Sequence, residues 1–246
     1  MSAGTLRELH VPGKPLLLPN AWDADTATLV EEAGFPVVAT SSVAVARTLG
    51  YPDGEGTPVG EVFAAVARIA RVVSVPVTVD AESGYGLEPA ELVERLLESG
   101  AVGCNIEDTD HGKGAPREAG EQADLLAGIR QAAGDALVLN ARVDMFLHGD
   151  ERTAFDEAVG RSRRYLDAGA DCVYPILAKR ADTIAALTEA LHPAAVNITY
   201  LPDGPGLAEL AGLGVARVSL GGGLWHAGRS WLKDRLTALS GGTPPY

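Results

Sequence analysis

The chain has 246 residues, of which 46% are hydrophobic and 22% are charged, a composition typical of a soluble globular protein. Its formal net charge of −13 argues against sequence-independent binding to nucleic acid or to an anionic membrane. No run approaches the ~18 apolar residues that span a bilayer, the N-terminus lacks an apolar signal core, and the two cysteines indicate no disulfide framework, so we expect a cytoplasmic protein.

Strand-like runs alternate with amphipathic helical stretches from end to end. The predicted strands are 16–19, 37–40, 77–80, 103–107, 137–142, 172–176, 196–199 and 217–220. Between them, helices are predicted over ranges that include 89–99, 118–133, 151–168, 181–191 and 207–213. Eight strands separated by helices imply a parallel sheet, and eight strands close into a barrel. We therefore predict a single α/β domain, a (β/α)8 TIM barrel over residues 1–240, with a loose tail over 241–246.

The segment Val75-Pro-Val-Thr-Val-Asp-Ala-Glu-Ser-Gly-Tyr-Gly86 carries the strongest functional signal. It is a short apolar run that ends in two acids, Asp80 and Glu82. Side chains two positions apart point to the same face of a strand, so the two carboxylates should repel each other unless a cation or proton lies between them. Hard oxygen ligands suit Mg2+ or Mn2+. The alternative is a solvated turn in which both acids face water.

Polar residues recur where other predicted strands end, which is how an α/β barrel builds an active site. They are Glu107 and Asp108; Asn140, Arg142 and Asp144; Ser41 and Ser42, followed by Asp53; and Asn197 with Thr199.

Two polar, glycine-rich loops follow predicted strands, at 50–58 and at 109–120. The second continues directly from Glu107 and Asp108, so we interpret it as a lid that closes over substrate and orders on binding. An exposed connection is the alternative interpretation.

Six motifs occur together in order: Asn20-Ala-Trp-Asp23, Thr40-Ser-Ser42, Leu49-Gly-Tyr-Pro-Asp-Gly-Glu55, Asp80-Ala-Glu-Ser-Gly-Tyr-Gly86, Ile106-Glu-Asp108 and Asn140-Ala-Arg142. This set resembles the isocitrate lyase/phosphoenolpyruvate mutase superfamily, from about residue 14 to residue 235. The resemblance implies a Mg2+-dependent barrel that breaks or makes a C–C or P–C bond next to a pyruvate-type enolate.

The resemblance also implies roles for individual residues. Asp80 would be the principal protein ligand of the metal, and Asp53, Glu82 and Glu107 would hold its waters. The backbone of Ser41, Ser42 and Val43 would bind the substrate carboxylate, and Arg142 would pair with that carboxylate or with the leaving group. Further candidates for substrate contact are Trp22, Asn140, Asn197, Thr199 and His226, and the catalytic candidates on the second loop are His111, Lys113 and Arg117.

The sequence departs from both well-understood branches of the family that it resembles. The lyase branch has Lys-Lys-Cys-Gly-His after the fourth strand, whereas this chain reads Asp108-Thr-Asp-His-Gly-Lys-Gly-Ala-Pro-Arg117, without cysteine. Thr109 stands where the mutase branch has a lysine, and the sixth strand ends in Tyr174-Pro-Ile176 without the expected histidine. The substrate is therefore left open.

Three functions remain at this point. The first is a Mg2+-dependent lyase or decarboxylase that acts on a 2-oxo or 2-hydroxy carboxylate, with Mn2+ as an alternative metal. The second is a phosphoenolpyruvate mutase or phosphonopyruvate hydrolase, and the third is a barrel that binds a metabolite without turnover. The predicted helix 224–239 carries a broad apolar face, and the resemblance implies exchange of this helix between subunits, so we expect a homotetramer or homodimer.

Overall fold

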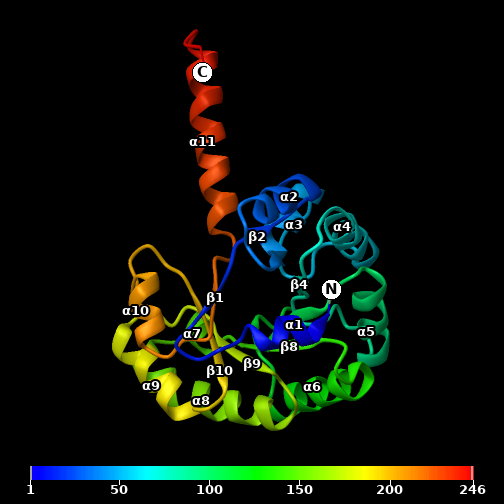
Figure 1. Ribbon diagram of the computed structural model, residues 1–246, viewed down its shortest axis with the longest axis vertical. Helices are drawn as coiled ribbons and strands as arrows, with labels where there is room; N and C mark the ends of the chain where they lie inside the picture. Colours follow the sequence, from blue (N-terminus) through cyan, green and yellow to red (C-terminus); the bar gives the residue numbers. More distant parts are fainter. Residues whose placement is uncertain (1, 245) are drawn as a thin grey trace.

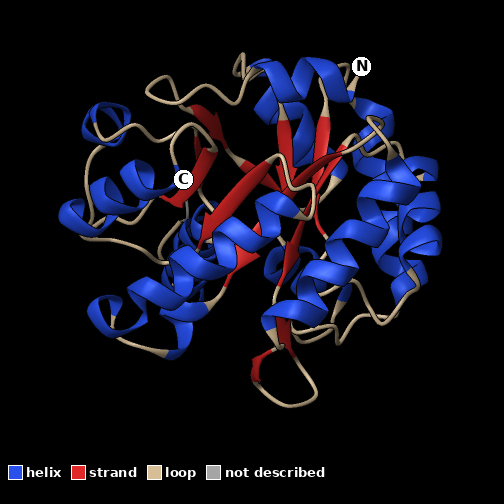
Figure 2. Cartoon of the chain, turned by 90° about the horizontal axis from the view of Figure 1, so that it is seen from below, coloured by secondary structure: helices blue, strands red, loops and turns tan. Residues whose placement is uncertain are grey.

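The computed structural model describes residues 2–244 and 246, and its centre is a barrel of parallel strands that helices cover on the outside (Figures 1 and 2). Nine strands form the sheet, in the order β1-β11-β10-β9-β8-β5-β4-β3-β2. They are β1 (Leu16–Leu18), β2 (Asn20–Ala21), β3 (Val38–Thr40), β4 (Val77–Asp80), β5 (Gly103–Glu107), β8 (Val138–Val143), β9 (Cys172–Pro175), β10 (Ala195–Thr199) and β11 (Arg217–Ser219).

The ninth strand arises because Pro19 interrupts the first predicted strand. Proline has no backbone N–H to donate to a neighbouring strand. On one side of Pro19, β1 pairs with β11; on the other, β2 pairs with β3. The two edge strands of the sheet, β1 and β2, are therefore consecutive in the chain, and the barrel is nearly closed. The prediction of a (β/α)8 barrel is confirmed, and the predicted strand positions hold to within two residues at each end.

The helices alternate with the strands, and all of them except the last contribute buried side chains. They are α1 (Ala3–Glu8), α2 (Ala24–Glu32), α3 (Ser42–Leu49), α4 (Val59–Val72), α5 (Pro89–Glu98), α6 (Ala119–Ala133), α7 (Met145–His148), α8 (Glu151–Asp167), α9 (Ala181–Leu191), α10 (Leu207–Gly212) and α11 (Gly223–Ser240). In α4, for example, Val62, Val66 and Ile69 recur at helical spacing and are buried, and Val66 and Ile69 belong to the main hydrophobic core.

Apolar side chains gather at the N-terminal end of the barrel, which α1 covers. Leu6 of α1 is fully buried and packs with Leu16, Leu18 and Val138. Gly103 at the start of β5 allows this close approach, because a Cβ at that position would lie 2.7 Å from Leu6. These contacts close the N-terminal end of the barrel, opposite to the end at which barrel enzymes carry their active sites.

Alternate residues of the strands point into the barrel or out toward the helices. The outward side chains, such as Val79, Ile106 and Ile198, belong to the main hydrophobic core. The inward positions toward the carboxyl ends of the strands are polar, and the structure buries them: Asn105, Glu107, Asn140, Asn197, Arg217 and Ser219. The sequence pattern therefore places polar groups inside the barrel.

The loop interpreted as a lid contains a short two-stranded antiparallel ribbon. Its strands are β6 (Thr109–Asp110) and β7 (Ala115–Pro116), paired in register. At its base, the Arg117 N–H donates to the Asp108 carbonyl at 2.7 Å.

Helix α11 extends away from the barrel (Figure 1), and none of its residues is buried. Its exposed apolar side chains include Trp231, which is 63% exposed, together with Leu232, Leu236 and Leu239. None of the helices in the described part of the chain combines the length and apolar character that crossing a membrane requires.

Candidate active site

Asp80 ends β4 at the carboxyl end of the barrel. Its backbone N–H donates to Thr40 Oγ1 at 2.9 Å, and its Oδ2 accepts a hydrogen bond from the Ser42 N–H at 3.1 Å. Ser42 is the first residue of α3, so the carboxylate lies at a helix N-terminus, where unpaired N–H groups favour negative charge. The described residues donate to only one of its two carboxylate oxygens. The other oxygen is therefore available to a ligand.

Glu82 faces the same site, but for a different reason from the one predicted. The strand ends at Asp80, and Glu82 takes a left-handed backbone with φ +47° in the turn that follows. Its Oε1 accepts from the Tyr85 hydroxyl at 2.7 Å, and its Oε2 accepts from the Glu55 N–H. Burial, together with the charges of Asp53 and Asp80, raises the pKa of Glu82 to about 7.

The acidic loop 50–58 reaches this turn through Glu55, a residue that the sequence analysis did not single out. Besides its N–H contact with Glu82, Glu55 accepts the Tyr85 N–H at 2.6 Å through its Oε1. Asp53, the residue predicted from this loop, is exposed, although its charge acts on Glu82. Glu55 also has a positive φ, +59°, and that local conformation is not readable from its residue type.

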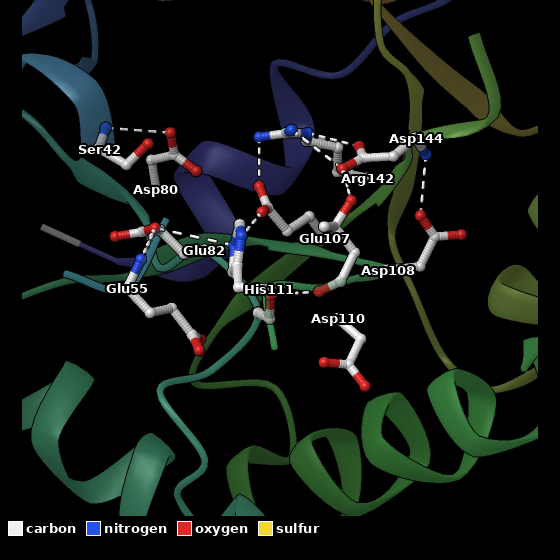
Figure 3. A network of polar contacts seen from close by, with 12 residues as sticks. Ser42, Glu55, Asp80, Glu82, Glu107, Asp108, Asp110, His111, Arg142 and Asp144 are labelled. Carbon is white, nitrogen blue, oxygen red and sulfur yellow. Dashed lines mark hydrogen bonds and ion pairs between the residues drawn. The ribbon is translucent and has the colours of Figure 1, made fainter. Parts of the chain in front are cut away.

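A chain of charged groups runs from His111 to Asp144 across the ends of β5 and β8 (Figure 3). Glu107 Oε1 lies 2.7 Å from His111 Nε2, and Glu107 Oε2 pairs with Arg142 Nη1. The other side of the Arg142 guanidinium is held by Asp144, with Nε–Oδ1 at 2.7 Å and Nη2–Oδ2 at 3.0 Å. Figure 3 also shows His111 between Glu82 and Glu107. Glu82, in the turn after β4, and Glu107, the last residue of β5, are thus linked through one imidazole.

The charges of this chain shift the pKa values of its members. Burial raises the pKa of Glu107 and outweighs the hydrogen bond from His111 and the charge of Arg142. The close contact with Glu107 raises the pKa of His111. Burial alone would lower the pKa of Arg142, but Glu107 and Asp144 raise it, so the guanidinium stays charged. The site therefore contains more carboxylates than cations, and they surround the fixed Arg142 guanidinium and the His111 imidazole.

The predicted cations of the ribbon do not reach the acids. Lys113 is 76% exposed on its side chain, and its Nζ lies 3.0 Å from Asp110 Oδ2. Arg117 donates to Gln122 Oε1 at 3.0 Å and to the Ser83 carbonyl at 3.1 Å, so it fastens the base of the ribbon. Of the three residues predicted on this segment, the structure brings only His111 into contact with the acids.

The family-model comparison matches residues 6–240 to phosphoenolpyruvate phosphomutase. The chain belongs to the isocitrate lyase/phosphoenolpyruvate mutase superfamily. It is 35% identical over 241 residues to the uncharacterized protein Rv1998c of Mycobacterium tuberculosis, which covers 97% of this chain and 90% of the relative. It is 30% identical over 217 residues to the oxaloacetate decarboxylase of Pseudomonas entomophila, covering 83% of this chain and 74% of that enzyme.

Solved structures agree with this membership. A candidate phosphonomutase from Burkholderia cenocepacia J2315 superposes with a TM-score of 0.90 at 37% identity, covering 96% of this chain and 99% of that one. The phosphoenolpyruvate phosphomutase of Streptomyces platensis subsp. rosaceus superposes with a TM-score of 0.84 at 25% identity, covering 99% and 89%. The superfamily relatives include lyases and mutases.

The superfamily resemblance predicted further contacts around these acids, and the structure places them at different depths. Ser41 precedes α3 and Val43 lies in its first turn, close to Gly222 beside His226. Trp22 is half-buried next to β2. Deeper in the barrel, Asn197 bonds Ser219 and Asn140 bonds Asn105, while Thr199 bonds the Tyr174 hydroxyl at 2.7 Å. The substrate roles of these residues stay predictions.

The donor set fits a divalent cation of the kind that this superfamily resemblance predicted. Asp80 offers a carboxylate oxygen, and Glu82 and Glu107 are acids whose raised pKa values show that nearby positive charge would stabilise them. Within residues 2–244 and 246, no three His, Cys, Asp or Glu side chains form a ready cluster of direct metal ligands. Magnesium commonly keeps several waters and takes only one or two protein carboxylates, so one direct ligand and several water-mediated acids suit it.

Proposed function

We propose that the protein is a Mg2+-dependent lyase or decarboxylase that cleaves a C–C bond of a 2-oxo or 2-hydroxy carboxylate. The observation that carries this proposal is the Arg142 guanidinium, which Asp144 holds from one side while Glu107 and His111 continue the chain toward Glu82. Fixed guanidinium N–H donors beside a group of carboxylates suit the binding of an anionic substrate together with a metal ion.

Asp80 would hold the cation directly, and Asp53, Glu82 and Glu107 would hold its waters. When bound, the cation would supply Lewis-acid stabilisation of negative charge on a substrate oxygen. Mn2+ fits the same oxygen donors. The superfamily relatives of known activity support this class of reaction, since one of them is an oxaloacetate decarboxylase.

Arg142 would bind the substrate carboxylate or the leaving group. Its Nε and Nη2 are held by Asp144, which fixes the plane of the guanidinium, while Nη1 and Nη2 each carry a second N–H. Positioning of this kind lowers the barrier because the orientation is set before the reaction.

His111 would carry a proton in this reaction. Its Nε2 contacts Glu107, and its ring packs on Gly54, where an added Cβ would lie 3.3 Å from Nδ1. The ribbon β6–β7 and the loop 50–58 therefore meet over the acids at His111. That contact would exclude water from a carbanionic product until a proton is delivered.

The structure gives the P–C reaction less support than the C–C reaction. A phosphonate enzyme needs cations for the phosphoryl group, and the candidates on the ribbon are Lys113 and Arg117. Lys113 is engaged with Asp110, and Arg117 with Gln122 and Ser83. Either would have to leave its partner before it contacted substrate.

We further propose that α11 packs against a second copy of this chain, giving a homodimer or a homotetramer. The helix extends from the barrel with Trp231, Leu232, Leu236 and Leu239 exposed along it. An exposed apolar face of this size is typical of an interface.

Calorimetric titration with oxalate, a mimic of the pyruvate enolate, tests the proposal. Oxalate should bind in the presence of Mg2+ and not in the presence of EDTA, and Arg142→Gln should weaken binding by at least about tenfold, equivalent to ~1.4 kcal/mol. Oxalate binding that needs neither metal nor Arg142 would contradict the proposed site.

A further inference from the structure

Arg217 is the largest fully buried side chain of the described protein, and the site described above does not use it. It begins β11, points into the barrel, and is 1% exposed. Its Nη2 donates to Asn105 Oδ1 at 3.0 Å. Its Nε and Nη1 have no hydrogen-bonding partner among the described groups, and no carboxylate of the described chain pairs with it. A buried guanidinium with so few partners is costly to folding.

Among the described residues, the one side-chain hydrogen bond of Arg217 leads to Asn105, in the layer next to Glu107 and Arg142. Asn105 Oδ1 also accepts the Asn140 Nδ2–H at 2.8 Å, so one oxygen joins Arg217 to both β5 and β8. Asn105 and Asn140 are register partners, and the next inward pair along the same strands is Glu107 and Arg142. The two asparagines therefore form the layer directly beneath the Glu107–Arg142 ion pair.

The unpartnered atoms around this layer are complementary. Arg217 has two nitrogens, Nε and Nη1, whose N–H groups have no partner among the described residues. Asn140 Oδ1, on the amide that binds the same oxygen, is a buried acceptor that likewise has no partner there. A buried water that accepts from a guanidinium N–H and donates to Asn140 Oδ1 would satisfy both, as internal waters do in proteins.

We propose that Arg217 is a positioning residue: it holds the Asn105–Asn140 layer beneath Glu107 and Arg142, directly through Nη2 and through buried water at its two other nitrogens. This role explains why a charge is kept where an apolar side chain would fill the barrel at less cost. It rests on the proposed function only for its kinetic test.

Two substitutions separate positioning from bulk stability. Arg217→Met fills similar volume without the charge or the donors, and Arg217→Lys keeps the charge but not the fork. Thr78→Val is the matched control, because Thr78 also lies inside the barrel with a buried, unpartnered hydroxyl but is not bonded to the asparagine layer.

A crystal structure of the native protein at about 1.5 Å resolution should show ordered water bound to Arg217 Nε or Nη1, as expected of buried polar groups. In Arg217→Met, the Glu107–Arg142 contact should be displaced. The inference would be overturned if no ordered water contacted Arg217 Nε or Nη1, or if the Glu107–Arg142 contact stayed in place in Arg217→Met. These results do not depend on activity. A wild-type protein that turned over none of the proposed substrates would refute the proposed function alone.

With active protein, Arg217→Met should lower kcat by at least about tenfold while KM changes less than about threefold. The Tm should hold or rise, Arg217→Lys should retain an intermediate kcat, and Thr78→Val should keep the native kcat. An unchanged kcat in Arg217→Met would overturn the inference. So would a lower kcat in Arg217→Met and Arg217→Lys that is accounted for by a lower Tm.

Discussion

Glu82→Gln should make the metal-free protein more stable at neutral and alkaline pH. The amide can keep both native contacts: its oxygen accepts the Glu55 N–H, and its NH2 donates to the Tyr85 hydroxyl, which reverses its role. The substitution therefore removes a buried negative charge and leaves the packing in place. The side chain is only 3% exposed, so solvent screens this charge little.

The magnitude follows from the pKa of Glu82. Burial raises it from 4.5 to about 7, so the folded state holds this proton at pH values where the unfolded state has lost it. The contribution of Glu82 to stability is complete below pH 4.5 and falls as the pH rises toward about 7. The full loss corresponds to about 3 kcal/mol. Of this, about 2 kcal/mol should appear between about pH 5.5 and about pH 8.5.

Urea unfolding of native and variant protein in EDTA, at a series of pH values, measures this difference. The free energy of unfolding of Glu82→Gln minus that of the native protein should grow by about 2 kcal/mol from about pH 5.5 to about pH 8.5. Glu94→Gln on α5 is the matched control, since Glu94 is exposed and has little desolvation to relieve. If the free energies of unfolding of Glu82→Gln and of the native protein changed with pH in parallel, Glu82 would not be a buried carboxyl with a raised pKa.

Asp80→Ala should abolish activity and should abolish Mg2+ binding in calorimetric titration. The stability of the metal-free protein should stay unchanged or rise, because repulsion among the acids falls. An unchanged Mg2+ affinity would contradict the metal assignment. Replacing Lys113 and Arg117 together by alanine should lower turnover by at least about tenfold while metal affinity barely changes, because Arg117 fastens the base of the ribbon that holds His111 over the acids. Native turnover would show that the ribbon is only a connection. Light scattering at micromolar concentration should give the mass of a dimer or tetramer, and Trp231→Glu on α11 should lower it; a monomeric native protein would contradict the interface.

The barrel could be predicted from the sequence because the periodicities of its strands and its helices are each visible within a few consecutive residues. Inward and outward residues alternate along each strand, and apolar residues recur at helical spacing in α4. Pro19 was visible as well, but its effect, the division of one strand between two neighbours, depends on how the sheet closes.

The candidate site was predictable in part. Asp80, Glu107 and Arg142 stand at strand ends, where the architecture itself brings them together. Glu55 could not be predicted, because its contact with Glu82 requires left-handed backbone at both residues. Arg217 lies inside the barrel, and Asn105, the only side chain that it bonds among the described residues, is 112 positions away in sequence. Contacts of this kind are set by tertiary packing rather than by any local pattern.

The most direct test of the account is an NMR screen of the purified protein with Mg2+ against oxaloacetate, malate-type acids, phosphonopyruvate and phosphoenolpyruvate, with Asp80→Ala and EDTA as controls for uncatalysed loss of substrate. We predict that a 2-oxo or 2-hydroxy carboxylate loses a C–C bond, that the reaction needs Mg2+, and that Asp80→Ala does not catalyse it. Turnover of the phosphorus compounds alone, or of none of these acids, would contradict the account.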